Sequence, residues 1–432
     1  MVANELSRQW LRRRLGVFDI YALVHSDIQS TYYFLVGFIA LAAGQWGFVG
    51  ALYGVLLMAA IALTYGEMGS RFPETGGSYL YVKYAFGSKI AFLSAWILAF
   101  DQIIMVAYGT IDASKILAKL FPALGAWEVI VAIALSTALF LLTTLGIRES
   151  ANLAKFVAIL DMVIIPSLIL LSLFYYPATP PFFNWSNVEG VSLLFAFSLL
   201  SRGFTGIDAI GQLAGEAKEP LVQVPRATLL VVAMGTFYGI GLMAAVMSAL
   251  TPEEIGDPAV APLYLAEKIH PLFLYLVAFD IFTVMMVAAL AGYISFSRMT
   301  YILADEKLLP AFFHRLHKKF RTPYISLAIT YVVSLLLISA GGVEIILAIY
   351  AIGSLINYIM IAIALAKASR SGTLHSAFKT PLIAGIPLSA WIALVLLPVG
   401  LGLTLIEKYP YLWVWILWIA AGALFYYIKR HA

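Results

Sequence analysis

Apolar residues fill this chain in runs of about twenty, and short polar connections separate the runs. A run of this length crosses the hydrocarbon core of a bilayer when it forms an α-helix. Ten-residue segments of alternating hydrophobicity are missing from the sequence, which argues against a transmembrane barrel. The pattern therefore predicts an all-α polytopic membrane protein with twelve transmembrane helices. Their predicted ranges are 16–43, 47–69, 90–112, 126–146, 154–176, 190–213, 227–250, 271–297, 324–340, 344–366, 382–405 and 411–428.

Composition and charge placement agree with a membrane location. Of the 432 residues, 62% are apolar and 12% are charged, about half the charged share of a soluble protein. Lys and Arg gather before the first run, in alternate connections and after the last run, as with Arg14, Arg148 and Lys429. By the positive-inside rule, we expect an integral plasma membrane protein, surrounded by lipid, with both termini in the cytoplasm. Cysteine is absent, which excludes disulfides and thiolate metal sites.

The first predicted helix carries a polar segment in its middle. Residues 25–31 read His-Ser-Asp-Ile-Gln-Ser-Thr between two apolar stretches. An ionisable side chain at this depth costs several kcal/mol unless it is paired, hydrated or bound to a ligand. Asp27 is therefore the first candidate for a binding residue.

The sixth predicted helix carries a second polar segment. It reads Ser-Arg-Gly-Phe-Thr-Gly over residues 201–206, and two glycines so close together weaken a helix. Polar breaks five helices apart predict that helices 1 and 6 are both discontinuous and that a site lies between them at the membrane midplane. The same spacing predicts one transmembrane domain over residues 1–432, built from an inverted repeat. Its parts are repeat one at about 16–176, repeat two at about 190–366 and two trailing helices at about 382–428.

Further acids lie inside predicted helices. Asp101, Asp161 and Asp280 fall in the third, fifth and eighth, and Asp208 follows the break in the sixth. The excess of acids over the single base Arg202 requires ions, protons or a cationic substrate for balance. Two other interpretations compete with function, because Asp101 would pair with Arg202 and Asp280 would be solvated near the outer surface.

Three segments give the chain a family likeness. They are GEMGSRFPETGGSYLYVKYAFG after the second helix, GFTGIDAIGQLAGEAKEPLVQVPRA at the sixth and SFSRMTYILADEKLLP at the end of the eighth. In this combination and order, the chain resembles the amino acid–polyamine–organocation (APC) superfamily. The resemblance implies a LeuT-type fold with a 5+5 inverted repeat. It also implies alternating access around helices 1 and 6 and coupling to protons or sodium.

The resemblance supports two substrates. Superfamily membership favours an amino acid or amine, whose ammonium would lie near Asp27 and whose carboxylate would meet Arg202 or the amides of the sixth helix. However, the first helix has no glycine at its polar segment, and its acid and hydroxyl residues are closer to the potassium importers of the superfamily. In that alternative, potassium or sodium would bind at Asp27, Asp101 and Thr205. The predicted substrate-binding residues for both alternatives are Asp27, Ser30, Thr31, Tyr33, Asp101, Ser201, Arg202, Gly203, Thr205 and Tyr350.

The resemblance also suggests a coupling site. Asp161 falls where proton-coupled carriers of the superfamily place a lysine, so it would carry the proton itself. Alternatively, Asp161 would bind sodium together with hydroxyls such as that of Ser295. We rank proton coupling first and sodium second.

Other classes of function find less support. The chain offers no nucleophile–base pair, metal-ligand set or phosphate-binding loop, so we expect neither an enzyme nor a cofactor. A channel or a transport-like sensor is a minor alternative, because no repeated filter sequence occurs. The sequence gives no sign of a nucleic-acid partner or an obligate protein partner.

Overall fold

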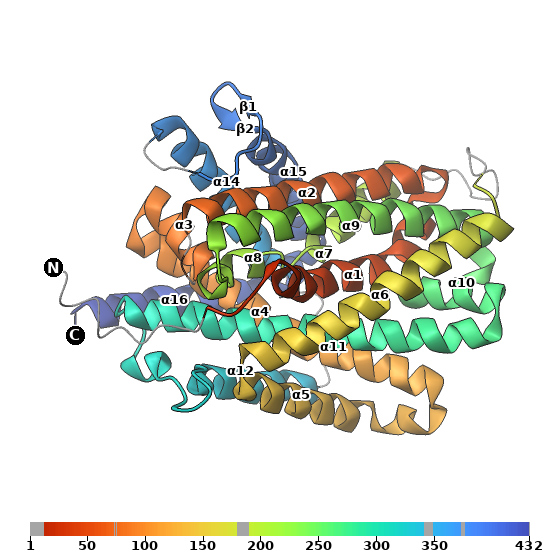
Figure 1. Cartoon of the computed structure of the whole chain (residues 1–432), viewed down its shortest axis with the longest axis horizontal. Coiled ribbons are helices and arrows are strands. Elements are labelled where there is room, and N and C mark those ends of the chain that lie inside the picture. The colour runs from red at the N-terminus through yellow and green to blue at the C-terminus, as the bar shows by residue number, and fades with distance from the viewer. Residues whose placement is uncertain are drawn as a thin grey trace.

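In the computed structural model of the chain, long helices lie side by side along the longest axis of the molecule (Figure 1). The structure describes residues 13–72, 74, 76–178, 190–340, 349–372 and 376–431. The earlier helices are α1 (Val17–Ala43), α2 (Gly47–Arg71), α3 (Gly77–Phe86), α4 (Ser88–Leu120), α5 (Glu128–Leu145), α6 (Ile147–Tyr175) and α7 (Gly190–Gly203). The later helices are α8 (Ala209–Gln212), α9 (Pro220–Ala249), α10 (Ala261–Ile269), α11 (Pro271–Asp305), α12 (Tyr324–Ser339), α14 (Ile352–Ser371), α15 (Leu388–Lys408) and α16 (Leu412–His431).

Short elements join several of these helices. A two-stranded antiparallel hairpin precedes α15 and projects from the bundle (Figure 1). Its strands are β1 (Leu382–Ile383) and β2 (Ile386–Pro387). The 3₁₀ turns are η2 (Gly44–Trp46), η3 (Pro122–Trp127), η4 (Ala214–Glu216), η5 (Pro252–Glu254), η6 (Pro258–Val260), η7 (Ala311–His314) and η8 (Tyr409–Tyr411). The all-α fold class is confirmed.

The apolar runs predicted most helix positions well. The ranges 47–69, 126–146 and 324–340 agree with α2, α5 and α12 to within two residues at either end. Eight stretches of the described residues are long and apolar enough to cross a membrane, and two of them, Val17–Arg71 and Leu388–Lys429, each contain two helices. Residues 341–348, at the start of the tenth predicted span, lie outside the described part. The count of twelve helices and the repeat boundaries stay predictions.

The helix α1 runs through the centre of the bundle. It contacts α6, α7, α9 and α11, and every residue from Ile20 to Gln29 is buried. By contrast, α6 and α16 expose large apolar side chains such as Phe174 and Ile416 on their outer faces. Exposed apolar surface of this extent suits contact with lipid.

The prediction of a break in the first helix is wrong, because α1 is continuous from Val17 to Ala43. Its polar segment contains neither Gly nor Pro. In addition, the Ser30 and Thr31 hydroxyls donate to the Asp27 carbonyl, at 2.8 and 3.1 Å. Bonds of this kind to a carbonyl three or four residues earlier are compatible with a helix. Polarity alone therefore did not interrupt α1.

The predicted break in the sixth helix is present. α7 ends at Gly203 and α8 begins at Ala209, with non-helical residues between them. Gly206 has φ +105°, a conformation that favours glycine. The glycines thus open the sixth helix next to the middle of α1.

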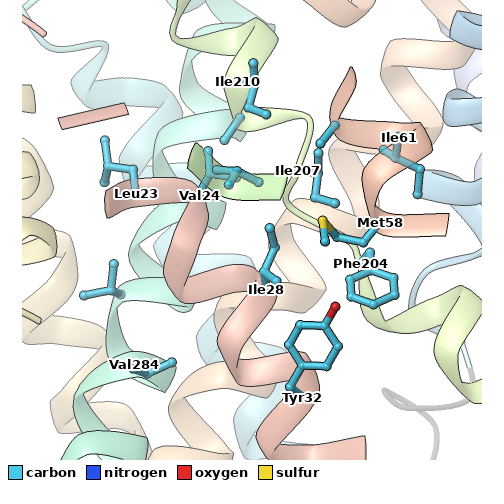
Figure 2. Close-up of a cluster of buried hydrophobic side chains, with 14 of the residues drawn as sticks. Leu23, Val24, Ile28, Tyr32, Met58, Ile61, Phe204, Ile207, Ile210 and Val284 are labelled. Atoms are coloured by element: carbon cyan, nitrogen blue, oxygen red, sulfur yellow. The ribbon is translucent and has the colours of Figure 1, made fainter. Parts of the chain in front are cut away.

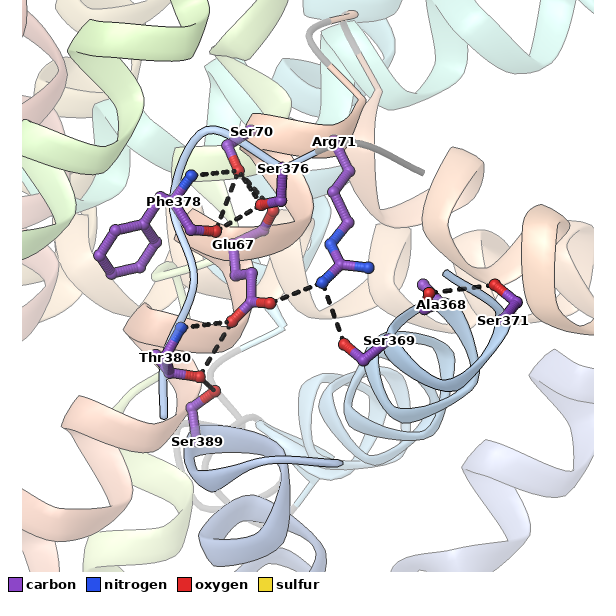
Figure 3. Close-up of polar contacts among 10 residues, drawn as sticks. All are labelled: Glu67, Ser70, Arg71, Ala368, Ser369, Ser371, Ser376, Phe378, Thr380 and Ser389. Carbon is purple, nitrogen blue, oxygen red and sulfur yellow. Dashed lines mark hydrogen bonds and ion pairs between the residues drawn. The ribbon is translucent and has the colours of Figure 1, made fainter. Parts of the chain in front are cut away.

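A buried carboxylate, that of Glu67, fixes the end of α2. Glu67 accepts hydrogen bonds from Arg71 Nη2 at 2.6 Å and from the Thr380 amide and hydroxyl, both at 2.9 Å (Figure 3). Ser70, one turn away, bonds to Ser376 at 2.7 Å. These contacts attach α2 to the segment that leads into the β hairpin.

Candidate functional site

A cavity of about 210 Å³ lies beside the middle of α1. Asp27, Ser30 and Thr31 line it from α1, and Gly203 and Thr205 line it from the break in the sixth helix. Its other walls are largely apolar or aromatic and include Phe34, Phe38, Met105, Tyr108, Leu199, Met285 and Tyr350. A cavity of this volume has room for several water molecules, which suits a small solute.

The Asp27 carboxylate is the unusual feature of this cavity. The residue is 2% exposed, and neither carboxylate oxygen accepts a hydrogen bond from a described residue. It lies against Gly206, where an added Cβ would come within 2.5 Å of the carboxylate carbon. A buried carboxylate without a partner is costly, so it favours binding a cation or a proton.

Hydroxyl groups connect the cavity wall to the interrupted helix. Thr31 donates a hydrogen bond to the Gly203 carbonyl, and the Thr205 hydroxyl bonds to that of Tyr350. An added Cβ at Gly203 would lie 2.3 Å from the Thr31 side chain, so glycine permits the close approach of α1 and α7. Four predicted residues besides Asp27 therefore come together here, and Ser30 joins them at the cavity surface.

An apolar layer separates the cavity from the end of the bundle where α1 begins. Figure 2 shows Leu23, Val24 and Ile28 of α1 near Ile207 and Ile210, which follow the break. All five side chains are at most 1% exposed. At the opposite side, Glu407 and Lys408 at the end of α15 line the cavity. The cavity thus extends toward the end of the bundle where α1 ends.

Two predicted binding residues have other partners. Asp101 accepts hydrogen bonds from the backbone amides of Ala351, at 3.1 Å, and Ser354, at 2.5 Å, so it caps the start of α14. By fixing the start of α14, it supports the adjacent Tyr350. The Ser201 hydroxyl bonds to Tyr53 at 2.6 Å and is not part of the cavity wall. The Arg202 side chain lies outside the described part of the structure.

A second polar cluster, the α1–α6–α11 cluster, lies on the other face of α1. It consists of His25, Tyr33, Asp161 and Asp280, all at most 2% exposed. His25 Nε2 is 2.7 Å from Asp161 Oδ2, and Tyr33 donates to Asp161 Oδ1. The same Tyr33 hydroxyl is 3.0 Å from Asp280 Oδ2. One phenol oxygen therefore joins carboxylates of α6 and α11.

This cluster corrects two sequence interpretations and leaves a third untested. Asp280 is fully buried, because α1 and α6 cover it, and is not solvated near a surface. Tyr33 was predicted to contact substrate but points to Asp161, since it lies two residues past Thr31 on a continuous helix. The buried Ser295 hydroxyl has no hydrogen-bond partner among the described residues, and its suggested binding of sodium together with Asp161 stays a prediction.

Several site residues escaped the sequence interpretation. The sequence marks His25 and Gln29 only as parts of a polar segment, and it assigns Phe34, Phe38 and Tyr108 to no site. Helical spacing offered a signal, because residues 25, 29 and 33 fall on one face and residues 27, 31, 34 and 38 on the other. An expected break within 25–31 hid that periodicity.

Comparisons with known proteins agree on transport. The family model described as amino acid permease matches residues 15–428. The low-affinity putrescine importer PlaP of Escherichia coli (strain K12) is 24% identical over 68% of this chain and 67% of the importer. The potassium transporter KimA of Bacillus subtilis (strain 168) is 26% identical over 73% of this chain and 54% of KimA.

A solved structure supports the fold. The crystal structure of MhsT in complex with L-phenylalanine aligns with a TM-score of 0.65, covering 93% of this chain and 99% of that one. At 14% identity the likeness concerns the fold alone. The LeuT-type fold expected from the sequence is confirmed.

Proposed function

Because the chain belongs to the amino acid permease family, we propose that it moves a small amino acid or amine across the membrane by alternating access. It is an integral membrane transporter and not an enzyme. One observation carries the proposal about the substrate: the buried Asp27 carboxylate lines a small cavity and has no partner among the described residues. A substrate ammonium group would supply the missing charge and hydrogen bonds.

The rest of the cavity favours an organic substrate. Phe34, Phe38 and Met105 present apolar surface within the same cavity as Asp27. Such a wall suits the carbon atoms of an amine or amino acid, whereas it offers nothing to a bare ion. A substrate carboxylate would meet the backbone of the interrupted helix, as in carriers with broken helices. Arg202 stays a predicted partner for it.

We further propose proton coupling through the α1–α6–α11 cluster. The Tyr33 hydroxyl has one proton to donate but two carboxylate neighbours, Asp161 and Asp280. If one of the two carboxyls holds a proton, it donates that proton to the Tyr33 oxygen, while Tyr33 donates its own proton to the other carboxylate. Both contacts of the Tyr33 hydroxyl are then hydrogen bonds. Asp27 and Tyr33 are on the same helix, so a movement of α1 would affect substrate and proton together.

Transport by the purified protein in liposomes tests both steps. Uptake of radiolabelled amino acids and putrescine is measured with and without an inward proton gradient. We expect Asp27→Asn to lose uptake and exchange, because the ammonium has no counter-charge. We expect Asp161→Asn to lose accumulation against a gradient but to keep exchange of substrate. Glu253→Gln, which removes an exposed carboxylate in η5, is the control. Full accumulation by both Asp variants would refute the proposal.

Potassium is the second candidate substrate. The Asp27 carboxylate, the Gly203 carbonyl and the Thr205 and Tyr350 hydroxyls are oxygen ligands suited to a hard cation. The relative KimA is named a potassium transporter. Against this candidate, Asp101 is occupied in capping α14. Rubidium uptake that disappears in Asp27→Asn and is unaffected by amino acids or amines would establish potassium and exclude the organic substrate.

A further inference from the structure

A pair of adjoining cavities lies at the end of the bundle where α1 begins, away from the cavity at Asp27. Their volumes are about 400 and 360 Å³, and both are lined by Arg14 and Arg148. The first is also lined by Lys155 and Lys218. The second is also lined by Lys319 and Arg321. We call the two together the basic cleft.

Backbone contacts fix the walls of the basic cleft. The amides of Arg14 and Leu15 donate to the Glu216 carbonyl at 2.8 and 2.9 Å, and the Lys218 amide donates to Leu15 at 2.9 Å. This short parallel ladder holds the residues before α1 beside those that follow the broken sixth helix. The first turns of α6 form the opposite wall, where Arg148, Asn152 and Lys155 recur at helical spacing on one face.

Most cations of the basic cleft have no acidic partner. Lys155 pairs with Asp19 at 2.8 Å, and Arg298 pairs with Glu216 at 2.8 Å. Among the described residues, no ion pair with an acid forms at the other five cations, which are Arg14, Arg148, Lys218, Lys319 and Arg321. Glu149 is the one remaining acid in the lining. Several like charges gathered around two cavities repel one another, and an anion would remove that repulsion.

We propose that the basic cleft binds a phosphate group, carried either by the headgroup of an anionic lipid or by a soluble phosphate compound. Arg is suited to phosphate because its planar guanidinium donates two parallel hydrogen bonds. Basic pockets at the membrane surface between helices are typical places for anionic headgroups. On α6, Phe156 and Ile159 adjoin Lys155 and are 59% and 56% exposed, so acyl chains have apolar surface next to the cleft.

Occupancy of the basic cleft would affect transport. A bound phosphate contacts the start of α1 and the exit of the sixth helix on one side, and α6 with the 319–322 segment on the other. It therefore stabilises the arrangement in which these four parts lie together. In that arrangement the apolar layer around Leu23 and Ile207 closes this end of the bundle, so the phosphate favours the closed state.

Thermal unfolding of the full-length protein in nanodiscs tests the proposal. The discs contain phosphatidylcholine alone, phosphatidylcholine with phosphatidylglycerol, or phosphatidylcholine with inorganic pyrophosphate in solution. The variants are Arg14→Gln/Arg148→Gln, the charge-keeping Arg14→Lys/Arg148→Lys, and the control Lys89→Gln at an exposed site in the first turn of α4. Unfolding in phosphatidylcholine alone shows whether each variant is folded.

We expect phosphatidylglycerol or pyrophosphate to raise the unfolding temperature of the wild type. The double Gln variant should need about 25-fold more of the anion for the same rise in unfolding temperature, because each cation removed costs about fivefold. The double Lys variant, which keeps both charges, should need a smaller increase than the double Gln variant. A response to phosphatidylglycerol alone identifies a lipid, and a response to pyrophosphate in neutral discs identifies a soluble phosphate. Absence of both responses, or an equal loss in Lys89→Gln, would overturn the proposal, because the effect would then be missing or due to general surface charge.

Discussion

The buried acids at the two faces of α1 differ in their hydrogen bonding. On one face, the carboxylate of Asp161, which α6 supplies, accepts hydrogen bonds from Tyr33 and His25 of α1. On the other, Asp27 has no hydrogen-bond partner among the described residues and borders a cavity. Both acids are buried in the bundle, so depth alone does not distinguish them. The difference lies in what the neighbouring helices offer.

This contrast separates two uses of a buried charge. Desolvation is costly for both acids, but hydrogen bonds to His25 and Tyr33 offset much of that cost at Asp161. At Asp27 the cost is offset only when a ligand or a proton arrives. Closely hydrogen-bonded groups such as Asp161, Tyr33 and His25 suit a proton that moves over short, fixed distances, whereas an open carboxylate suits a substrate that enters and leaves.

The largest effect is expected at the contact between Gly206 and Asp27. In Gly206→Ala the new Cβ would meet the Asp27 carboxylate, and an L side chain at φ +105° adds strain of about 1–2 kcal/mol. We expect uptake into liposomes to be abolished. Gly402→Ala in α15, where no atom lies within 4 Å of the added Cβ, should transport normally. Normal transport by Gly206→Ala would show that this contact does not shape the site.

Accessibility should differ sharply between adjacent residues on α1. The chain has no cysteine, so a single introduced thiol is the only one present. We expect a thiol reagent to modify Ser30→Cys, which faces the cavity, and substrate to protect it. Gln29→Cys, on the face of Asp161, should stay unmodified, because Gln29 is fully buried. Equal labelling of the two would mean that the faces are not separated as described.

Stability should respond to the two acids in opposite ways. Asp161→Asn leaves His25 and Tyr33 without their charged acceptor and should lower the free energy of unfolding by about 3 kcal/mol. Asp27→Asn removes an unpaired charge and should not destabilise the protein, although substrate should no longer stabilise it. Denaturant unfolding in detergent, with and without substrate, measures both. A similar loss in the two variants would contradict the contrast between the faces.

A surface carboxylate provides the smallest effect and the reference for the buried ones. The hydrogen bond from Lys268, at 2.6 Å, holds the pKa of Glu254 below its usual range. The pair therefore adds stability above the ordinary pKa of Glu and loses it as pH falls through the lowered value. Because both side chains are partly exposed, Lys268→Gln should cost less than about 0.5 kcal/mol at neutral pH and less still at pH 3. Unfolding at the two pH values checks this, and an equal loss at both would assign it to packing.

Local sequence predicted the helices and one of the two breaks. Long apolar runs gave the positions of α2, α5 and α12, because an apolar run of about twenty residues is long enough to cross the membrane as a helix. Gly203 and Gly206 marked the break in the sixth helix, since glycine alters the backbone itself. The polar residues of α1 gave a false break because hydroxyl side chains can bond within a helix. Only their bonds to the Asp27 carbonyl in the fold decide that question.

By itself, the sequence determined that this is a helical membrane protein and that the residues near Asp27 and Gly203 belong to its candidate site. The length of an apolar run, a charge within such a run and the backbone freedom of glycine can all be recognised from neighbouring residues alone. The tertiary structure decided which acids are satisfied. Asp101 caps α14 from 250 residues away, Asp161 meets His25 across 136 residues, and Asp27 meets the cavity. These partnerships depend on how distant helices are placed and rotated, and no local pattern specifies that packing.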